Sequence, residues 1–237
     1  MDGQTGREPA INAPAVVIAV LAALLAMHVL RQVISPALDR EILIYLAFLP
    51  IRFGEGGGEL PGGWLVAYTS LVSHALLHID WMHLILNSAW MLAFGALIAR
   101  RTGALRFVLL LMVAAAAGAL AYLAVSGVSQ TIVMGASGAV SGLMGAGFRL
   151  IFVVLDRGGI RFLQEHTDLV PRMPLAVAVR DTRVLMSTAV WIGVNLLFGI
   201  VFPNLLAAGG IAWEAHLGGF FAGLLLFQFF DRGRGWH

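Results

Sequence analysis

The sequence of 237 residues contains no cysteine and no lysine, and only 12% of its residues are charged. Without cysteine there can be no disulfide, no thiolate metal site and no cysteine nucleophile. Without lysine, a P-loop lysine, a Schiff base and a Ser–Lys dyad are all excluded. Soluble domains carry about 25% charged residues, so the scarcity of charge also excludes an ordinary soluble enzyme.

What replaces charge is hydrophobicity. Hydrophobic residues make up 59% of the chain, and its mean hydropathy is +0.88, whereas soluble domains are about 45–50% apolar. The formal net charge is only +2, so the pI of 9.7 does not indicate a nucleic-acid partner. The composition predicts an integral membrane protein of the all-α class in contact with membrane lipids.

Six apolar runs have the roughly 17–25 residues that a helix needs to cross the hydrocarbon core. They cover residues 13–30, 82–99, 107–125, 138–155, 184–202 and 213–230. Turn and charge signals separate them, among them Arg100-Arg101, Gly127 and Pro203-Asn204. We therefore expect six transmembrane helices.

The arginines predict the orientation of these spans. They are concentrated in the connections after the second and fourth runs, with Arg7 before the first run and Arg232 and Arg234 after the last, while residues 126–136 and 203–212 carry no charge. Because basic residues accumulate on the cytoplasmic side, we expect both termini to be cytoplasmic. The second, fourth and sixth helices then begin at the outer face.

The spans form one predicted domain, residues 13–231, between short cytoplasmic tails at 1–12 and 232–237. The outer loop 31–79 is broken by proline and glycine, and its segments 41–53 and 64–74 are expected to lie partly in the interface. A signal peptide is an alternative for the first run, although the run exceeds the usual apolar core and no cleavage site follows it. The short tails favour the cell membrane of a prokaryote.

Several polar residues lie where lipid is expected, and such residues are functional candidates by default. Counted at about 1.5 Å per residue from the inner-face charge that ends each helix, four of them lie roughly 18–26 Å from the inner surface. The four are Ser137, Asn87, His216 and His83. The hydrocarbon core is about 30 Å thick, so these residues predict a cavity open to the outer side.

Ser137 follows a loop that must dip into the membrane, within the sequence Gly135-Ala136-Ser137-Gly138. Free backbone N–H groups and the helix dipole at this position favour a developing oxyanion. The alternative is that Ser137 simply caps its helix.

His216 precedes a Gly219-xxx-Gly223 face, which allows close helix packing. A serine and a histidine at matched depth on closely packed helices could form a nucleophile–base pair, although a lone buried histidine can also be a packed core residue. On the second helix His83 and Asn87 share a face, and Asp80 is a candidate N-cap. A metal site built from His74, His78 and His83 is the alternative there.

These residues resemble the rhomboid family of intramembrane serine proteases. The motifs are His-x4-His-x3-Asn on the second helix, Gly-x-Ser-Gly opening the fourth, and Ala-His-x2-Gly-x3-Gly on the sixth. The resemblance implies a six-helix bundle around a water-filled cavity and needs no metal or cofactor. It implies Ser137 as nucleophile, His216 as general base, His78 and Asn87 beside the oxyanion, and a structural His83.

The chain departs from the family pattern in two places. Many members carry an aromatic residue four positions after the nucleophile, packed on the histidine ring, whereas here that residue is Ser141. The family's Trp-Arg pair in the first loop is also missing, and residues 50–53 are the nearest basic–aromatic element. Glu214 lies about 200° around the helix from His216 and is not expected to complete a triad.

The expected activity is hydrolysis of peptide bonds in or near transmembrane segments of protein substrates. Paired-aspartate and zinc proteases are disfavoured, because the spans lack a second buried aspartate and an HExxH motif. A transporter or channel and an inactive relative that binds transmembrane clients are the competing interpretations. The sequence predicts no oligomeric state.

Overall fold

The computed structural model describes residues 13–167, 169–202 and 211–233. Within these residues the chain is helical, and its extended segments contribute one isolated antiparallel bridge, between Phe48 and Val133. The α-helices are α1 Ala15–Val33, α2 Pro36–Leu46, α3 Gly63–Ser73, α4 Trp81–Thr102, α5 Ala104–Ser126, α6 Ser137–Asp156, α7 Gly159–Glu165, α8 Leu175–Ala178, α9 Thr182–Leu196 and α10 Trp213–Phe230. Short helical turns are η1 Pro50–Phe53, η2 Gly57–Glu59, η3 His74–Leu76 and η4 Leu197–Val201.

Five of these helices are long and apolar enough to cross a membrane, which fits a multi-pass integral membrane protein. They are α1, α4, α5, α6 and the continuous Thr182–Val201 helix formed by α9 and η4. The sixth predicted span corresponds to α10, which is not among these five and contains the polar residues Glu214, His216 and Gln228. The predicted tail 1–12 and the Pro203-Asn204 turn lie outside the described residues.

Helix ends follow local signals in the sequence. Asp80 is the N-cap of α4, as predicted, and its carboxylate accepts the His83 N–H at 2.8 Å. Gly103 ends that helix with a φ of +76°, which favours glycine. Arg100 and Arg101 occupy the last turn of α4, where positive charge complements the helix dipole.

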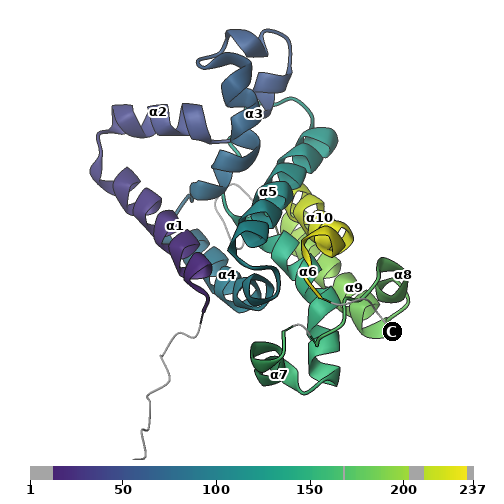
Figure 1. The fold of residues 1–237 in the computed structure, drawn as a ribbon. Helices are drawn as coiled ribbons and strands as arrows, with labels where there is room; N and C mark the ends of the chain where they lie inside the picture. Colours follow the sequence, from purple (N-terminus) through teal and green to yellow (C-terminus); the bar gives the residue numbers. More distant parts are fainter. Residues whose placement is uncertain (1–12, 168, 203–210, 234–237) are drawn as a thin grey trace, which may run out of the picture.

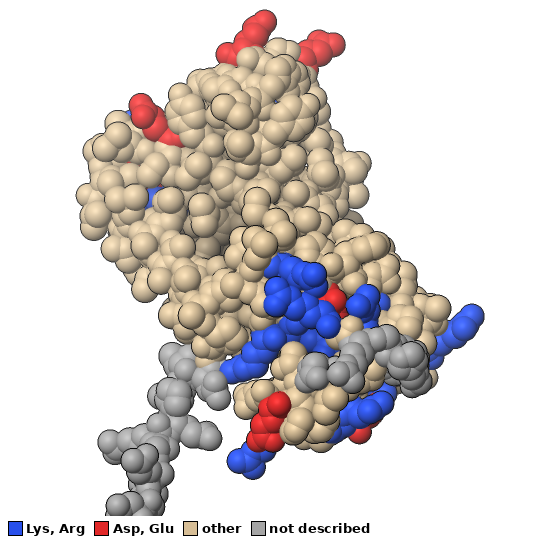
Figure 2. All heavy atoms as spheres, viewed as in Figure 1, with Lys and Arg blue, Asp and Glu red and all other residues tan. Residues whose placement is uncertain are grey.

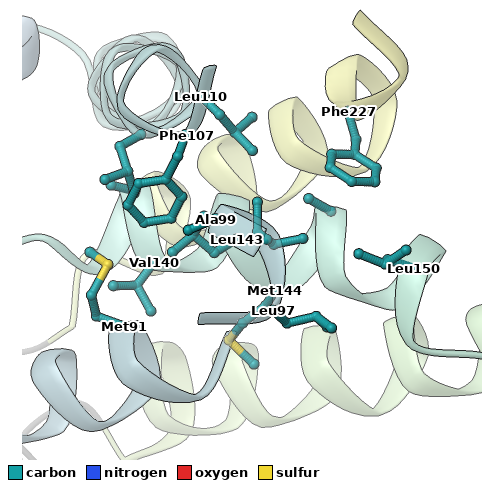
Figure 3. Close-up of a cluster of buried hydrophobic side chains, with 14 of the residues drawn as sticks. Met91, Leu97, Ala99, Phe107, Leu110, Val140, Leu143, Met144, Leu150 and Phe227 are labelled. Atoms are coloured by element: carbon teal, nitrogen blue, oxygen red, sulfur yellow. The ribbon is translucent and has the colours of Figure 1, made fainter. Parts of the chain in front are cut away.

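The α6 helix is the centre of the bundle, with 78% of its membrane-length window buried. Its apolar side chains pack against α4, α5 and α10, and Figure 3 shows Leu143 of α6 among Met91 of α4, Phe107 of α5 and other buried residues. By contrast, α1 and α9 lie at the periphery, and α2 and α3 extend from one end of the bundle (Figure 1). The centre of the bundle is therefore one helix that is largely enclosed by protein.

Glycines allow the backbones of α6 and α10 to touch. A Cβ on Gly219 would overlap the carbonyl oxygen of Gly138, and one on Gly223 would overlap that of Gly142. On the opposite side of α10, a Cβ on Gly218 would meet the carbonyl oxygen of Ala117 in α5. We call the α6–α10 contact the glycine seam. It corresponds to the close approach predicted from the spacing of these glycines.

Arginines gather at the end of the molecule that carries α7, whereas acidic groups mark the opposite end near α3 (Figure 2). Some of these arginines are structural. Buried Arg101 pairs with Asp231 at 2.5 Å, and buried Arg149 donates to the carbonyls of Leu224 and Met173. Such buried cations must be paired or hydrogen-bonded to be tolerated. These contacts join α4 and α6 to the C-terminal part of α10 at the α7 end of the bundle.

An ion-pair cluster holds the start of α9 at the same end. Arg183 contacts Asp156 of α6 at 2.8 Å and Asp181, the N-cap of α9, at 2.9 Å. The hydrogen bond from Arg183 holds the pKa of the Asp181 carboxyl below its usual range. This anchors one end of a helix that is otherwise little packed by protein.

Replacing Gly223 with alanine tests the glycine seam. We expect Gly223→Ala to lower the free energy of unfolding by about 1–3 kcal/mol, the usual effect of overpacking, because the new Cβ meets rigid backbone. Thermal unfolding of the purified protein in detergent measures the change. The matched control is Gly193→Ala on α9, where no described atom lies within 4 Å of the added Cβ. Equal unfolding temperatures for the two variants would contradict the seam.

Candidate active site

A cavity of about 1020 Å³ lies among α4, α6, α9, α10 and the loop before α6. Its lining includes Ser137, His216, Asn87, His83 and Asn195. Three of the four predicted site residues thus line one cavity, while the fourth, His78, is not among the residues that line it. Much of the remaining lining is apolar, including Leu86, Trp90, Val190, Val194 and Phe198.

Ser137 is the first residue of α6 and is not its cap. The N-cap is Ala136, and α6 has no side-chain cap hydrogen bond, so the interpretation of Ser137 as a capping serine is wrong. The first N–H groups of a helix have no intrahelical partner. The Ser137 hydroxyl therefore lies beside free backbone donors at the positive end of the helix dipole.

The loop before Ser137 is held by backbone hydrogen bonds to the residues that follow α2 and α3. Phe48 and Val133 exchange two bonds, at 3.0 and 2.9 Å, and the Gly135 N–H donates to the His74 carbonyl at 3.0 Å. Gly135 has a φ of +131°, and a Cβ there would meet the His83 ring. Glycine is thus required at Gly135, because both the backbone angle and the space exclude a side chain.

His216 lies in the first turn of α10, next to the glycine seam. The carbonyl oxygen of Ala215, the preceding residue, lies 3.4 Å from where a Cβ on Gly138 would stand. The seam thus brings the chain next to His216 against the chain next to Ser137. Among the described residues, no hydrogen bond joins these two side chains. The His216 Nδ1 is instead 2.8 Å from the Asn195 Oδ1.

The α4 helix contributes Asn87 and His83 from one face. The Asn87 Nδ2 donates to the His83 carbonyl at 3.0 Å, and because the amide has two hydrogens, one remains for the cavity. The position that a Cβ on Gly135 would occupy lies 2.8 Å from the His83 Nε2 and 3.6 Å from the Ser137 Oγ. The His83 ring therefore borders the same small space as the serine hydroxyl.

His78 occupies a different environment. It precedes α4, is fully buried, and packs edge-on against the His83 ring with centroids 5.1 Å apart. Neither of its ring nitrogens has a hydrogen-bond partner in the part of the chain described. Its carbonyl accepts from Arg31 at 2.9 Å. His78 thus supports His83 from behind, away from the cavity.

Two other residues singled out in the sequence have defined surroundings. Ser141 is buried in α6 and lines the cavity, and it offers no ring to pack on His216. Glu214 accepts a hydrogen bond from Ser126 at the end of α5. Its carboxylate is therefore engaged away from the imidazole, in agreement with the angle around the helix.

The structure gives no support to a three-histidine metal site. The His74 Nδ1 is 2.9 Å from the Ser70 carbonyl. Within residues 13–167, 169–202 and 211–233, no group of three or more histidine, aspartate or glutamate side chains could hold a metal ion. The described histidines are arranged by packing and hydrogen bonds.

Sequence reasoning missed the contact between Asn195 and His216. An amide inside the apolar fifth span is a polar residue of the kind that marks function in a bilayer. That signal identifies Asn195 as a candidate without naming its partner, since the register between α9 and α10 is set by tertiary packing.

Comparison with known proteins identifies the family of the chain. A family model of the rhomboid domain matches residues 66–232, a range that runs from α3 through α10 and includes every residue named around the cavity. A comparison with curated proteins gives no match. The family match extends over well more than half of the sequence, and the chain therefore belongs to the rhomboid family, a family of intramembrane proteases.

Proposed function

We propose that this protein is a serine endopeptidase that hydrolyses peptide bonds in or near transmembrane segments, with Ser137 as nucleophile and His216 as general base. The observation that carries the proposal is that these side chains, from two helices joined by the glycine seam, line one cavity. The apolar lining contributed by α4 and α9 suits an apolar peptide segment as substrate.

The reaction follows from the positions of these groups. The imidazole of His216 takes the hydroxyl proton as the Ser137 oxygen attacks the scissile carbonyl, giving a tetrahedral oxyanion. His216 then returns the proton to the leaving amine, and the C–N bond breaks to leave an acyl-serine. Water, deprotonated by His216, hydrolyses that ester and releases Ser137. A hydrogen bond between Ser137 and His216 need form only with substrate, since such contacts often tighten in the complex.

The oxyanion is stabilised by hydrogen-bond donors that lie near the N-terminus of α6. These are the Ser137 N–H, the second hydrogen of the Asn87 amide and the His83 imidazole. In this proposal His83 takes the place that the family resemblance gave to His78, because His83 borders the space beside the Ser137 Oγ and His78 is buried behind it. The role of Asn87 is the one expected from the sequence.

The topology proposed from the sequence is six spans with both termini cytoplasmic and the cavity open to the outer side. It is supported by α10, which packs as the sixth helix of the bundle, and by the arginines at the α7 end (Figure 2). The same arginines argue against a channel. At that end Arg101 pairs with Asp231, and Arg149 donates to the Leu224 carbonyl, so the space between the helices is filled by buried contacts. A pore would need a polar path through the full thickness of the membrane.

Substitution of the proposed nucleophile separates an active protease from an inactive client-binding relative. Ser137→Ala should abolish cleavage of a synthetic transmembrane substrate in proteoliposomes, because the attacking oxygen is gone. A fluorophosphonate probe should label the wild-type protein, and mass spectrometry should locate the adduct on Ser137 and not on the nearby Ser141. Cleavage that survives Ser137→Ala would exclude the serine mechanism. A folded wild-type protein that the probe does not label would favour the inactive relative.

Variants in and just before α4 test the oxyanion donors. Asn87→Ala and His83→Ala should each lower kcat about a hundredfold to a thousandfold, the usual effect of losing one such donor, with little change in KM. His78→Ala should mainly lower the unfolding temperature, because it leaves a cavity behind the His83 ring. Steady-state kinetics and thermal unfolding of all three variants provide the comparison. A His78 variant with normal unfolding and a hundredfold lower kcat would reverse the assignment of the two histidines.

A further inference from the structure

The hydrogen bond between His216 and Asn195 joins the proposed base to the fifth span. The His216 Nδ1 and the Asn195 Oδ1 are 2.8 Å apart. Asn195 belongs to α9, close to the point where the helix passes into η4. A polar side chain on a span with only 6% of its residues buried would be costly if it faced lipid, and here it turns to the cavity.

A second hydrogen bond fixes which end of the Asn195 amide faces the histidine. The Asn195 Nδ2 is 2.9 Å from the Trp191 carbonyl oxygen. A carbonyl only accepts, so the NH₂ group must point to Trp191 and the amide oxygen to His216. An amide oxygen also only accepts, and the His216 Nδ1 must therefore carry a hydrogen. In the neutral ring this leaves the lone pair on Nε2.

The amide is held in place by aromatic packing. The Trp191 ring, one turn before Asn195, stacks on the Phe220 ring with centroids 4.2 Å apart and planes 13° apart. Phe220 lies one turn after His216 on α10. The stack therefore ties the turn of α9 that carries the acceptor to the turn of α10 that carries the base.

We propose that Asn195 is a positioning residue for the serine protease chemistry, completing a Ser137–His216–Asn195 arrangement. The inference rests on the proposed function and extends it. Asn195 selects the His216 tautomer with a free Nε2 and fixes the orientation of the ring. Where many family members place an aromatic residue against the histidine, this chain has Ser141, and the restraint comes from α9 instead. The same division of roles occurs in Cys–His–Asn proteases.

The consequence for the reaction is specific. When Nε2 takes the Ser137 proton, the imidazolium keeps its Nδ1 hydrogen on the Asn195 oxygen, so no proton moves to the amide. The uncharged amide stabilises this cation through its dipole, less than a carboxylate would. Because this hydrogen bond becomes charge-assisted as the imidazolium forms, it is stronger in the transition state than in the resting enzyme. We expect its loss to slow the reaction about tenfold, which corresponds to about 1.36 kcal/mol.

Three variants separate the acceptor from the bulk of the side chain. Asn195→Leu keeps the volume and removes the acceptor, and we expect kcat to fall about tenfold with KM changed less than twofold. Asn195→Asp keeps an acceptor oxygen and should retain kcat within threefold of wild type. The control Thr188→Val removes a buried α9 hydroxyl that has no hydrogen-bond partner among the described residues, and should leave kcat unchanged. Equal losses for Asn195→Leu and Asn195→Asp, or none for Asn195→Leu, would overturn the proposal.

A spectroscopic measurement gives a readout that does not need activity. In ¹⁵N-histidine-labelled wild-type protein, with His216 assigned by the signal that His216→Ala removes, we expect protonated Nδ1 and unprotonated Nε2. Asn195→Leu should give a mixture of tautomers. Finding the His216 proton on Nε2 in the wild-type protein would overturn the positioning role, even if the variant enzymes unfold.

Fluorophosphonate labelling keeps the two proposals apart. Wild-type protein labelled at Ser137 together with an Nε2-protonated His216 would refute the role of Asn195 and leave the protease intact. Wild-type protein that is folded and yet unlabelled would refute the protease itself, whichever tautomer is found.

Discussion

The site depends on the contact between α6 and α10, in which glycine replaces side chains and backbone meets backbone. Hydrophobic association cannot drive helices together in a solvent of acyl chains, so close van der Waals contact must do so. Gly219 and Gly223 face the carbonyls of Gly138 and Gly142. The seam starts one residue beyond Ser137 and three beyond His216. The contact that stabilises the bundle is therefore also the contact that sets the separation of the two helices carrying the proposed chemistry.

A second constraint acts on the loop that leads into α6. Irregular backbone at membrane depth must find its hydrogen bonds within protein or water, and here Phe48 and His74 provide them. The helices α2 and α3, which look peripheral in Figure 1, thus bear on the placement of Ser137 through the bonds that Phe48 and His74, just after them, make with the loop. Gly135 completes the arrangement by leaving room for the His83 ring.

Much of the helical framework could be predicted from the sequence, because length, hydropathy and end signals are local properties. Asp80 illustrates this, since an N-cap depends on the residues that follow it. Helical periodicity likewise places His83 and Asn87 together. It says nothing about His78, which precedes the helix and whose direction is set by burial against neighbours. The family resemblance placed His78 beside the oxyanion, whereas the residue that lines the cavity together with Asn87 is His83.

The contact of Asn195 with His216 lay beyond sequence reasoning for a similar reason. It depends on the rotation of α9 relative to α10, and that rotation depends on which rings stack, here Trp191 on Phe220. Composition can identify an amide in an apolar span as unusual, but a hydrogen bond between spans is a tertiary property. Because Ser141 stands where many family members have an aromatic residue, either another group restrains His216 or its ring is looser, and the sequence does not decide between these two.

The low burial of α9 has a consequence for the setting in which the protein works. Only 6% of its membrane-length window is buried by protein, so in a bilayer the residues that do not line the cavity would contact acyl chains. Ion pairs with Arg183 hold its α7 end. A span that does not match the thickness of the bilayer tilts, and in α9 the Arg183 ion pairs at one end and the Trp191–Phe220 stack nearer the other are contacts that resist such a tilt. The position of α9 therefore depends on few protein contacts, in contrast to α6, whose membrane-length window is 78% buried.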